Sequence, residues 1–129
     1  MRICTFLFLV AICLAGCRKE DTITNVNPVS PVFRIDLMST FKSDSVRVSI
    51  DQVIVFADTV STKPTMGYSN SFYPSVTTGS HTISVDILNE HIKADTTLYI
   101  SDTTLVLVNY DRTPKRISFA KYSFLVMYF

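Results

Sequence analysis

The sequence is poor in glycine and histidine, and each scarcity excludes a class of site. Its 129 residues contain three glycines, Gly16, Gly67 and Gly79, which lie too far apart to build a phosphate-binding loop or a dinucleotide fingerprint. The two histidines, His81 and His91, are expected in neighbouring strands with more than ~20 Å between them, too far to share one metal ion. We therefore expect no cofactor and no metal site.

A long apolar run is also missing, and the apolar segment that opens the chain is short. Met1 and Arg2 supply one positive charge, and the next twelve residues, 3–14, are interrupted only by Thr5 and two cysteines. A membrane-spanning helix needs roughly 20 apolar residues, so this segment has the length and order of a cleavable signal peptide. The alternative is a buried N-terminal helix with an incidental cysteine.

The four residues Leu14-Ala15-Gly16-Cys17 resemble the lipobox of bacterial lipoproteins, in which small residues precede the cysteine that receives the lipid. The resemblance implies that residues 1–16 are removed as a signal peptide and that Cys17 is lipidated, which attaches the protein to a membrane. Cys4 and Cys13 would leave with the signal peptide. The remaining 113 of the 129 residues could then form no internal disulfide and would offer no free thiol for catalysis.

The residues after Cys17 indicate in which membrane the protein is expected and which side it faces. Arg18 stands where an aspartate would retain a lipoprotein in the inner membrane, so we expect the outer membrane. Lys19-Glu20-Asp21 is similar to the export signal of Gram-negative lipoproteins that are displayed on the cell surface; a domain that faces the periplasm is the alternative. Residues 17–31 are polar, lack periodicity and end in NPVSP, so we interpret them as a lipidated cysteine and a flexible tether.

Neither charge sign dominates, which argues against a nucleic-acid partner. Without Arg2 the chain has eleven basic and eleven acidic side chains. Five of its nine aspartates precede Ser or Thr and then an aliphatic residue or Thr, and these triplets resemble the O-glycosylation acceptors of the same bacterial groups. The alternative is that such an aspartate marks a turn that leads into a strand. The resemblance implies acceptors at Thr22, Ser45, Thr59, Thr96 and Thr103.

From residue 32 onward, apolar and polar residues alternate with the period of two that half-buried antiparallel strands require. Segment 53–57 is apolar throughout, so we expect a central strand covered on both faces, reached through a turn at Asp51-Gln52. A hairpin is expected around Asn89-Glu90. Without a convincing helix, residues 32–129 predict an all-β fold: a single antiparallel two-sheet β-sandwich, immunoglobulin-like, of about eight strands.

The eight-residue segment Thr78-Gly79-Ser80-His81-Thr82-Ile83-Ser84-Val85 resembles the Gly-x-His-x-Ile-x-Val strand of PEGA-like and related immunoglobulin-like β-sandwiches of bacterial envelope proteins. In that family the glycine permits a tight turn and the following residues form a strand at the edge of the core. The resemblance therefore implies a structural unit and no particular chemistry.

Two apolar features are candidates for function. The segment TMGYSNSFYPSV, residues 65–76, places Tyr68, Phe72 and Tyr73 in an expected loop, where exposed rings could stack on sugars or anchor a protein partner. The alternative is that these rings cap one end of the core. The terminal FLVMYF, residues 124–129, is expected to be a central strand, a covered edge or an interface, because an exposed apolar edge would promote aggregation.

Two functions remain open. The first is a non-enzymatic binding or structural module of the cell envelope, anchored through its N-terminal lipid and contacting a glycan or an envelope protein. The second is a hydrolase of envelope or extracellular polymers. The sequence favours the first, because it has two histidines, no retained thiol and nothing that resembles a nucleophile elbow, so we assign no catalytic residue.

Overall fold

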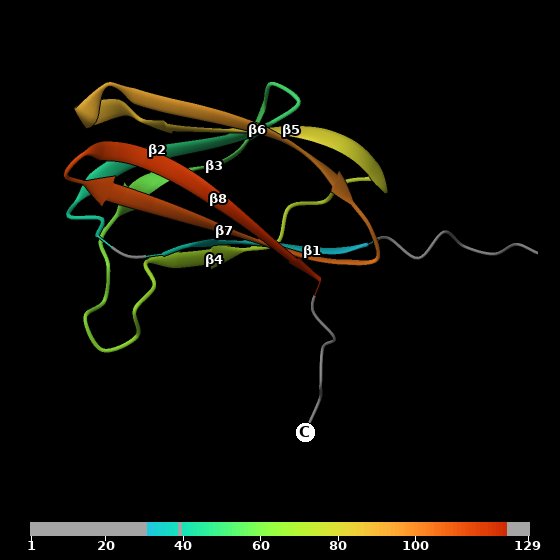
Figure 1. Ribbon diagram of the computed structural model, residues 1–129, viewed down its shortest axis with the longest axis horizontal. Coiled ribbons are helices and arrows are strands. Elements are labelled where there is room, and N and C mark those ends of the chain that lie inside the picture. The colour runs from blue at the N-terminus through green and yellow to red at the C-terminus, as the bar shows by residue number, and fades with distance from the viewer. Residues whose placement is uncertain (1–30, 39, 124–129) are drawn as a thin grey trace, which may run out of the picture.

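The computed structural model describes residues 31–38 and 40–123. Cys17, Thr22 and the terminal segment 124–129 lie outside the described residues, so the predictions made for them are not tested by it. The described chain forms two four-stranded sheets that pack face to face (Figure 1), which confirms the all-β two-sheet sandwich of about eight strands. Within these residues no helix is long and apolar enough to cross a membrane.

Each sheet contains four of the eight described strands. Sheet A has the order β4-β1-β7-β8, and sheet B has the order β3-β2-β5-β6. A single 3-10 turn, η1 (Leu88–Glu90), joins β5 to β6. The strands are β1 (Val32–Leu37), β2 (Asp44–Ile50), β3 (Val53–Val60), β4 (Asn70–Phe72), β5 (Gly79–Ile87), β6 (Ile92–Ile100), β7 (Thr103–Arg112) and β8 (Lys115–Ser123).

One strand pairing is parallel. β1 pairs with β7 from Val32 opposite Thr103 to Leu37 opposite Val108, whereas all other pairings of the described strands are antiparallel. In addition, β2 and β3 form a hairpin within one sheet, whereas the immunoglobulin constant arrangement places its second and third strands in opposite sheets. The connectivity of this sandwich therefore differs from that of the immunoglobulin constant domain.

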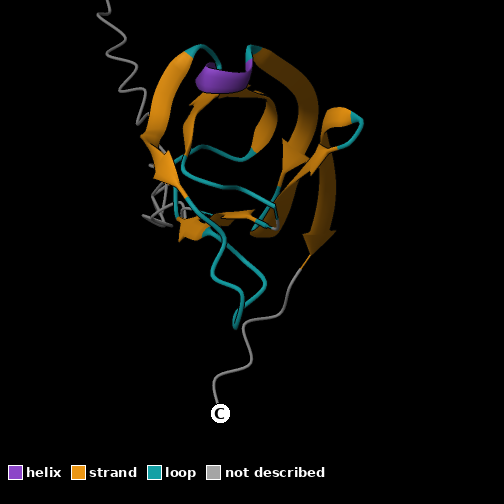
Figure 2. Ribbon diagram, turned by 90° about the vertical axis from the view of Figure 1, so that its left-hand side faces the viewer, coloured by secondary structure: helices purple, strands orange, loops and turns teal. Residues whose placement is uncertain are grey.

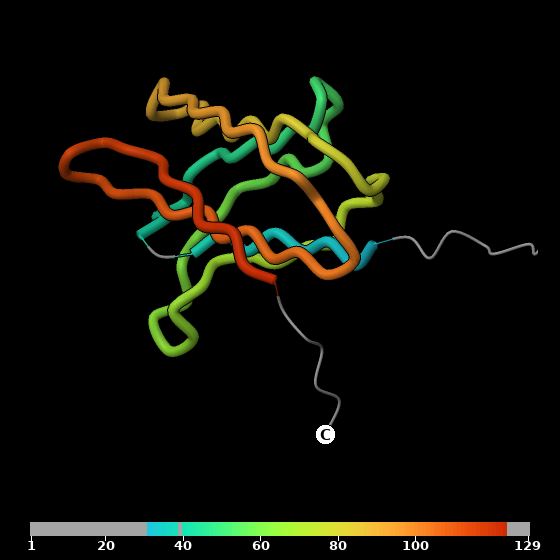
Figure 3. Tube along the Cα trace, turned by 45° about the vertical axis from the view of Figure 1, so that its right-hand side comes forward, coloured from blue at the N-terminus to red at the C-terminus, as the bar shows by residue number. Residues whose placement is uncertain are grey.

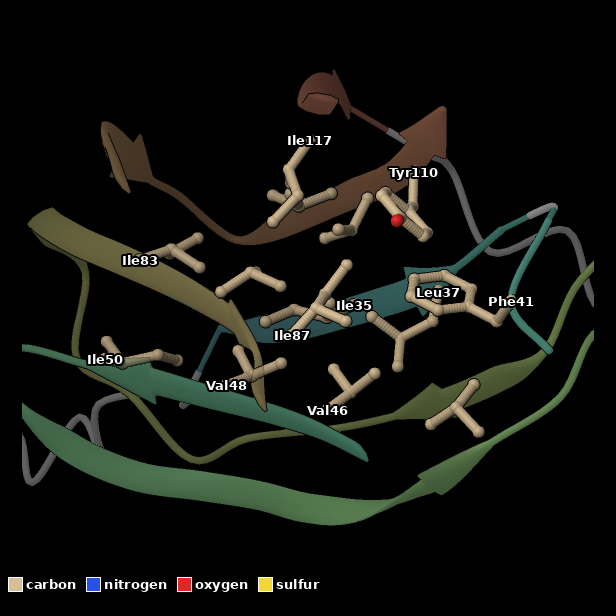
Figure 4. Close-up of a cluster of buried hydrophobic side chains, with 14 of the residues drawn as sticks. Ile35, Leu37, Phe41, Val46, Val48, Ile50, Ile83, Ile87, Tyr110 and Ile117 are labelled. Atoms are coloured by element: carbon tan, nitrogen blue, oxygen red, sulfur yellow. The ribbon is translucent and has the colours of Figure 1, made fainter. Parts of the chain in front are cut away.

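The core lies between the two sheets and is built by the inward residues of each alternation (Figure 4). The predicted alternation is confirmed on β1, β2 and β5, because the alternate apolar residues of β1 and β2, and those of β5 from Ile83 onward, are buried there. The buried apolar side chains are Phe33, Ile35, Leu37, Phe41, Val46, Val48, Ile50, Val60, Ile83, Val85, Ile87, Ile100, Val106, Val108, Tyr110 and Ile117.

The prediction for segment 53–57 was wrong. β3 is the edge strand of sheet B, and the side chains of Val53 and Ile54 are 66% and 56% exposed. A register shift between Val48 and Ser49 of β2 leaves Val55 of β3 without a directly opposed partner, as in a β-bulge. Bulges at a sheet edge disturb the regular ladder, which discourages another chain from pairing there.

The predicted turn at Asp51-Gln52 is confirmed and joins β2 to β3 without a glycine. Both residues have positive φ angles, 49° and 69°, as a two-residue type I′ hairpin requires. The predicted hairpin around Asn89-Glu90 is also confirmed, with Ile87 opposite Ile92 in the register. Its connection is longer than two residues, because η1 precedes His91, which has a φ of 53°.

Both open sides of the sandwich are closed by contacts between edge strands (Figure 2). On one side the rings of Phe56 in β3 and Phe72 in β4 stack with centroids 4.6 Å apart. On the other side Lys121 in β8 donates a 2.5 Å hydrogen bond to the carbonyl of Tyr99 in β6. Each sheet is thus fastened to the other at both of its edges.

The two ends of the sandwich carry different segments, as Figures 1 and 3 show. We call the end at which β1 begins the tether end. β8 finishes at the same end, because Val32 and Ser123 lie opposite Thr103 and Thr104, the first two residues of β7. The turns between β2 and β3 and between β6 and β7 are at this end too. The far end carries η1, the β7–β8 turn and the loop 61–69.

Candidate functional site

The outer face of sheet B is hollowed along its middle. Two adjoining hollows of ≈ 280 and ≈ 390 Å³ share Gln52, Ser84 and Lys93, so they form one shallow depression. Its floor is made by small side chains, because Ser49 of β2 lies directly opposite Ser84 of β5. The remaining lining residues are Arg47, Asp51, Ile54, Thr82, Asp86 and Asp95.

Long charged side chains form the rim of this depression. Arg47 and Asp86 lie opposite each other in the register and form an ion pair with 2.7 Å between nitrogen and oxygen. Lys93 and Asp95 lie at the β6 side with their charged groups 4.0 Å apart. The rim therefore offers donors and acceptors of both signs, an arrangement suited to a polar, hydrogen-bonding partner with little net charge.

The sequence did not point to this depression, although a signal for it was present. The outward residues of β2 and β5 are polar, which the alternation predicts, but alternation alone does not show which strands become neighbours. Only the register places Ser49 beside Ser84 and so creates a low floor between the tall side chains. Two serines at matching outward positions of paired strands are the pattern that would have predicted it.

The structure separates the three candidate aromatic residues. Phe72 is half-buried in β4 against Phe56, so for this residue the interpretation as part of the core holds. Tyr68 is 37% exposed in the loop at the far end, next to Met66, which is 58% exposed. Tyr73 is 65% exposed and follows β4 at the tether end. The three rings therefore do not form one binding strip.

Tyr73 borders a small groove at the tether end. The groove measures ≈ 260 Å³ and is lined mostly by apolar and proline side chains. Since Pro31 is part of the lining, the groove lies where the expected tether enters the sandwich. The lining residues are Pro31, Val32, Phe33, Tyr73, Pro74, Ser75 and Val76.

His81 connects the β2–β3 turn to the segment that precedes β5. Its Nδ1 lies 2.6 Å from the carboxylate of Asp51, and its Nε2 lies 2.7 Å from the carbonyl oxygen of Thr77. Both partners are hydrogen-bond acceptors, so the protonated imidazole, which donates from both nitrogens, satisfies both contacts. The pKa of His81 is therefore raised, mainly by the hydrogen bond to the Asp51 carboxylate. A catalytic histidine of a serine triad instead directs one nitrogen at a hydroxyl.

A second polar cluster lies at the far end and holds β2 to the β7–β8 hairpin. The Asp44 side chain is buried and accepts hydrogen bonds from Arg112 at 2.5 Å, from Asn89 at 2.9 Å and from the Lys42 backbone at 2.8 Å. Burial raises the pKa of Asp44, but these donors outweigh burial, so its pKa lies below the ordinary value. The guanidinium of Arg112 also lies 5.4 Å from the centre of the Tyr110 ring.

Four predicted glycan acceptors lie within the described residues, in different surroundings. Thr59 is exposed on the edge strand β3, whereas Thr96 is half-buried on the face of β6 that also carries the core residue Leu98. Ser45 is half-buried at the start of β2, directly after the buried Asp44, and Thr103 is half-buried at the start of β7. Of these four, Thr59 has the most open surroundings.

Comparison with protein-family models, with curated proteins and with solved structures finds no match to this chain. Among residues 31–38 and 40–123, no three His, Cys, Asp or Glu side chains lie close enough together to hold a metal ion. The site is therefore interpreted from its own geometry.

Proposed function

We propose that this chain is a lipoprotein of a Gram-negative outer membrane, anchored through Cys17, whose β-sandwich is a non-enzymatic binding module of the cell envelope. The observation that carries the proposal is the order of parts along the sequence. A short apolar segment ends in Leu14-Ala15-Gly16-Cys17, and a polar stretch then leads to β1 at Val32. This order is expected of a signal peptide, a lipid anchor, a tether and a folded domain.

The surroundings of His81 support a binding role over a hydrolase that works through a serine–histidine pair. The imidazole is occupied by Asp51 and Thr77, so it has no nitrogen left for a serine hydroxyl. His91 is exposed and follows η1 at the opposite end of the hairpin. Neither described histidine is thus placed to act as a general base on a shared substrate.

The depression on the outer face of sheet B is the surface that we assign to the partner. Hydroxyl groups on its floor and ion pairs on its rim can exchange hydrogen bonds with a polyhydroxylated chain, and Ile54 adds one exposed apolar contact. A glycan of the envelope has this chemistry. A depression this open gives weak binding for a single contact, so affinity would depend on several copies held in one membrane.

The anchor is tested by growing a Gram-negative host that expresses the full chain with labelled palmitate. We expect label in the wild-type protein, none in Cys17→Ser, and a mass that shows loss of residues 1–16. Arg18→Ala serves as the matched control, because it changes the neighbouring residue and leaves the cysteine. An unlabelled wild-type protein that retains its first sixteen residues would refute the anchor.

The binding surface is tested with purified cell-wall sacculi and capsular polysaccharide as probes in a sedimentation assay. Ser84→Arg fills the floor of the depression and is expected to abolish co-sedimentation. Ser118→Arg is the control, because Ser118 is a half-buried serine in β8 of sheet A, away from the depression. Equal binding by both variants would remove sheet B from the proposal.

A glycan carried by the protein itself is proposed at Thr59, the acceptor whose side chain is exposed. We expect Thr59→Val to remove a glycan mass from the protein isolated from its native host. Thr96→Val is expected to leave that mass unchanged, since Thr96 lies on the inner side of β6. A glycan that persists in Thr59→Val would contradict the assignment.

A further inference from the structure

The exposed large apolar side chains of the described residues are distributed unevenly between the two ends. Met66, Tyr68 and Leu88 lie at the far end. The other six lie toward the tether end: Val32, Val53, Ile54 and three tyrosines. Tyr73, Tyr99 and Tyr122 are 65%, 57% and 52% exposed. From this distribution we infer that the tether end rests on the lipid surface, with the three tyrosine rings placed among the phospholipid headgroups.

The strand registers place these tyrosines around one end of the sandwich. In sheet A, Arg34 of β1, Leu105 of β7 and Tyr122 of β8 lie side by side in the register. On the other edge of the sheet, Tyr73 directly follows Phe72, which lies opposite Ile35 of β1. Tyr73 and Tyr122 therefore lie on opposite edges of sheet A, about 14 Å apart at ~4.8 Å per strand spacing. Tyr99 lies opposite Ser80 in sheet B, next to the last residues of β6.

Tyrosine suits such a position, because its ring is apolar and its hydroxyl remains hydrated. Tyrosine and tryptophan are enriched at membrane–water interfaces for this reason. Tyr99 points outward from sheet B, because its neighbour Ile100 is buried, and Tyr122 points outward from sheet A, where it lies opposite Leu105. Rings on both flanks of the tether end would fix the orientation of the domain as well as its distance from the lipid.

Both parts of the chain that leave the described domain start at this same end. Residues 17–30 precede Pro31 and, under the proposed function on which this inference rests, connect it to acyl chains on Cys17. The six residues that follow Ser123 read FLVMYF, all apolar and uncharged in their side chains. Because β1 begins and β8 finishes at the tether end, the described chain has its first and last strand ends on the same side.

The charges at the tether end indicate which kind of lipid surface fits. The guanidinium of Arg34 is paired with Asp36 at 2.5 Å, and the remaining charged side chains near the tyrosines include both signs, Lys121 and Asp102. With no excess of positive charge, the contact should not require anionic lipids, and salt should weaken it little. We therefore choose phosphatidylcholine vesicles as the probe.

The experiment uses the fact that the sequence has no tryptophan. The full lipidated protein is reconstituted into phosphatidylcholine vesicles with brominated acyl chains, and Tyr73→Trp, Tyr99→Trp and Tyr122→Trp are compared with Tyr68→Trp from the far end. We expect several-fold stronger fluorescence quenching and a blue-shifted emission for the first three, at low and at high salt. Quenching no stronger than that of Tyr68→Trp would overturn the inference.

Two further readouts separate this inference from the proposed anchor. Palmitate incorporation and flotation with the vesicles report the anchor for each variant, whereas quenching reports the position of the ring. A lipidated variant that floats with the vesicles but is not quenched at residues 73, 99 and 122 refutes the docked orientation and leaves the anchor standing. Equal quenching at residue 68 would mean a domain without fixed orientation, which also refutes it.

Discussion

The imidazole of His81 at the start of β5 contacts the carboxylate of Asp51 in the β2–β3 turn, with 2.6 Å between Nδ1 and Oδ2. The other carboxylate oxygen of Asp51 accepts the backbone N–H of Thr82 at 2.9 Å. Asp51 thus has two hydrogen-bond partners, one for each carboxylate oxygen. It links the β2–β3 turn to the first residues of β5. This contact makes the stability of the fold depend on pH.

We expect the contribution of this pair to be greatest between the ordinary pKa values of the two groups. The pKa of His81 is raised, so its contribution is full below about pH 6.5 and is lost as the pH rises through the raised value. The pKa of Asp51 is lowered, first by the Thr82 N–H and then by His81, so its contribution is lost as the pH falls through that lowered value.

Thermal unfolding of the wild type and of Asp51→Asn at several pH values measures this effect. Asparagine tolerates the positive φ and can still accept from Thr82, so the variant removes the charge and replaces the acceptor that faces His81 with an amide NH2 group. The difference in melting temperature should be largest near pH 5.5, and it should shrink as the pH rises through the raised pKa of His81. A difference that does not change with pH would show that the ion pair contributes nothing.

Loss of the buried Asp44 carboxylate should destabilise the fold more than loss of any exposed charge. Asp44→Ala leaves the Lys42 N–H, the Asn89 amide and part of the Arg112 guanidinium without their acceptor. We expect a loss on the order of 3 kcal/mol in the free energy of unfolding by urea. Arg116→Ala, which breaks an exposed 3.3 Å pair with Asp111, should cost less than about 1 kcal/mol.

The β2–β3 turn should gain stability from glycine. Gln52 has a φ of 69°, a conformation that costs a residue with a side chain roughly 1 kcal/mol and costs glycine little. We expect Gln52→Gly to raise the free energy of unfolding by about 0.5–1 kcal/mol. Thr97→Gly, in the regular strand β6, should lower it instead, and an equal effect of both changes would contradict this explanation.

The neighbouring aromatic residues Phe72 and Tyr73 should respond differently to truncation. Phe72 stacks on Phe56 and closes one side of the sandwich, so Phe72→Ala should cost about 2 kcal/mol or more. Tyr73 is 65% exposed, so Tyr73→Ala should change the free energy of unfolding by no more than about 0.5 kcal/mol. Urea titrations of the two variants check this, and similar losses would place Tyr73 in the core.

The fold class was predictable because alternation is a local property. The inward apolar positions of β1, β2 and β5 follow from the period of two alone, and the hairpin of β5 and β6 follows from two alternating segments on either side of Asn89-Glu90. The edge position of β3 was not predictable in this way, because an apolar run such as residues 53–57 does not indicate which strands become its neighbours. That position is decided by a pairing between distant segments, because β2 uses its other edge to pair with β5 and leaves β3 outermost in sheet B.

The candidate sites were less predictable for the same reason. Phe72 and Tyr73 are adjacent in the sequence, yet one packs on Phe56 and the other is exposed, because alternate residues of a strand point to opposite sides. Asp44 belongs to one of the predicted glycosylation triplets, but its surroundings are set by Arg112, 68 positions later. No local pattern contains that information.

The parallel pairing of β1 and β7 also restricts the order in which the domain can be completed. β1 lies between β4 and β7, and each of its residues is matched with one 71 positions later, from Val32 with Thr103 to Leu37 with Val108. A chain that emerges from a channel with its N-terminus first would present β1 early and its central neighbour almost last. Until β7 emerges, β1 can pair only with β4, so one of its two edges stays open through most of synthesis and sheet A is completed in its last step.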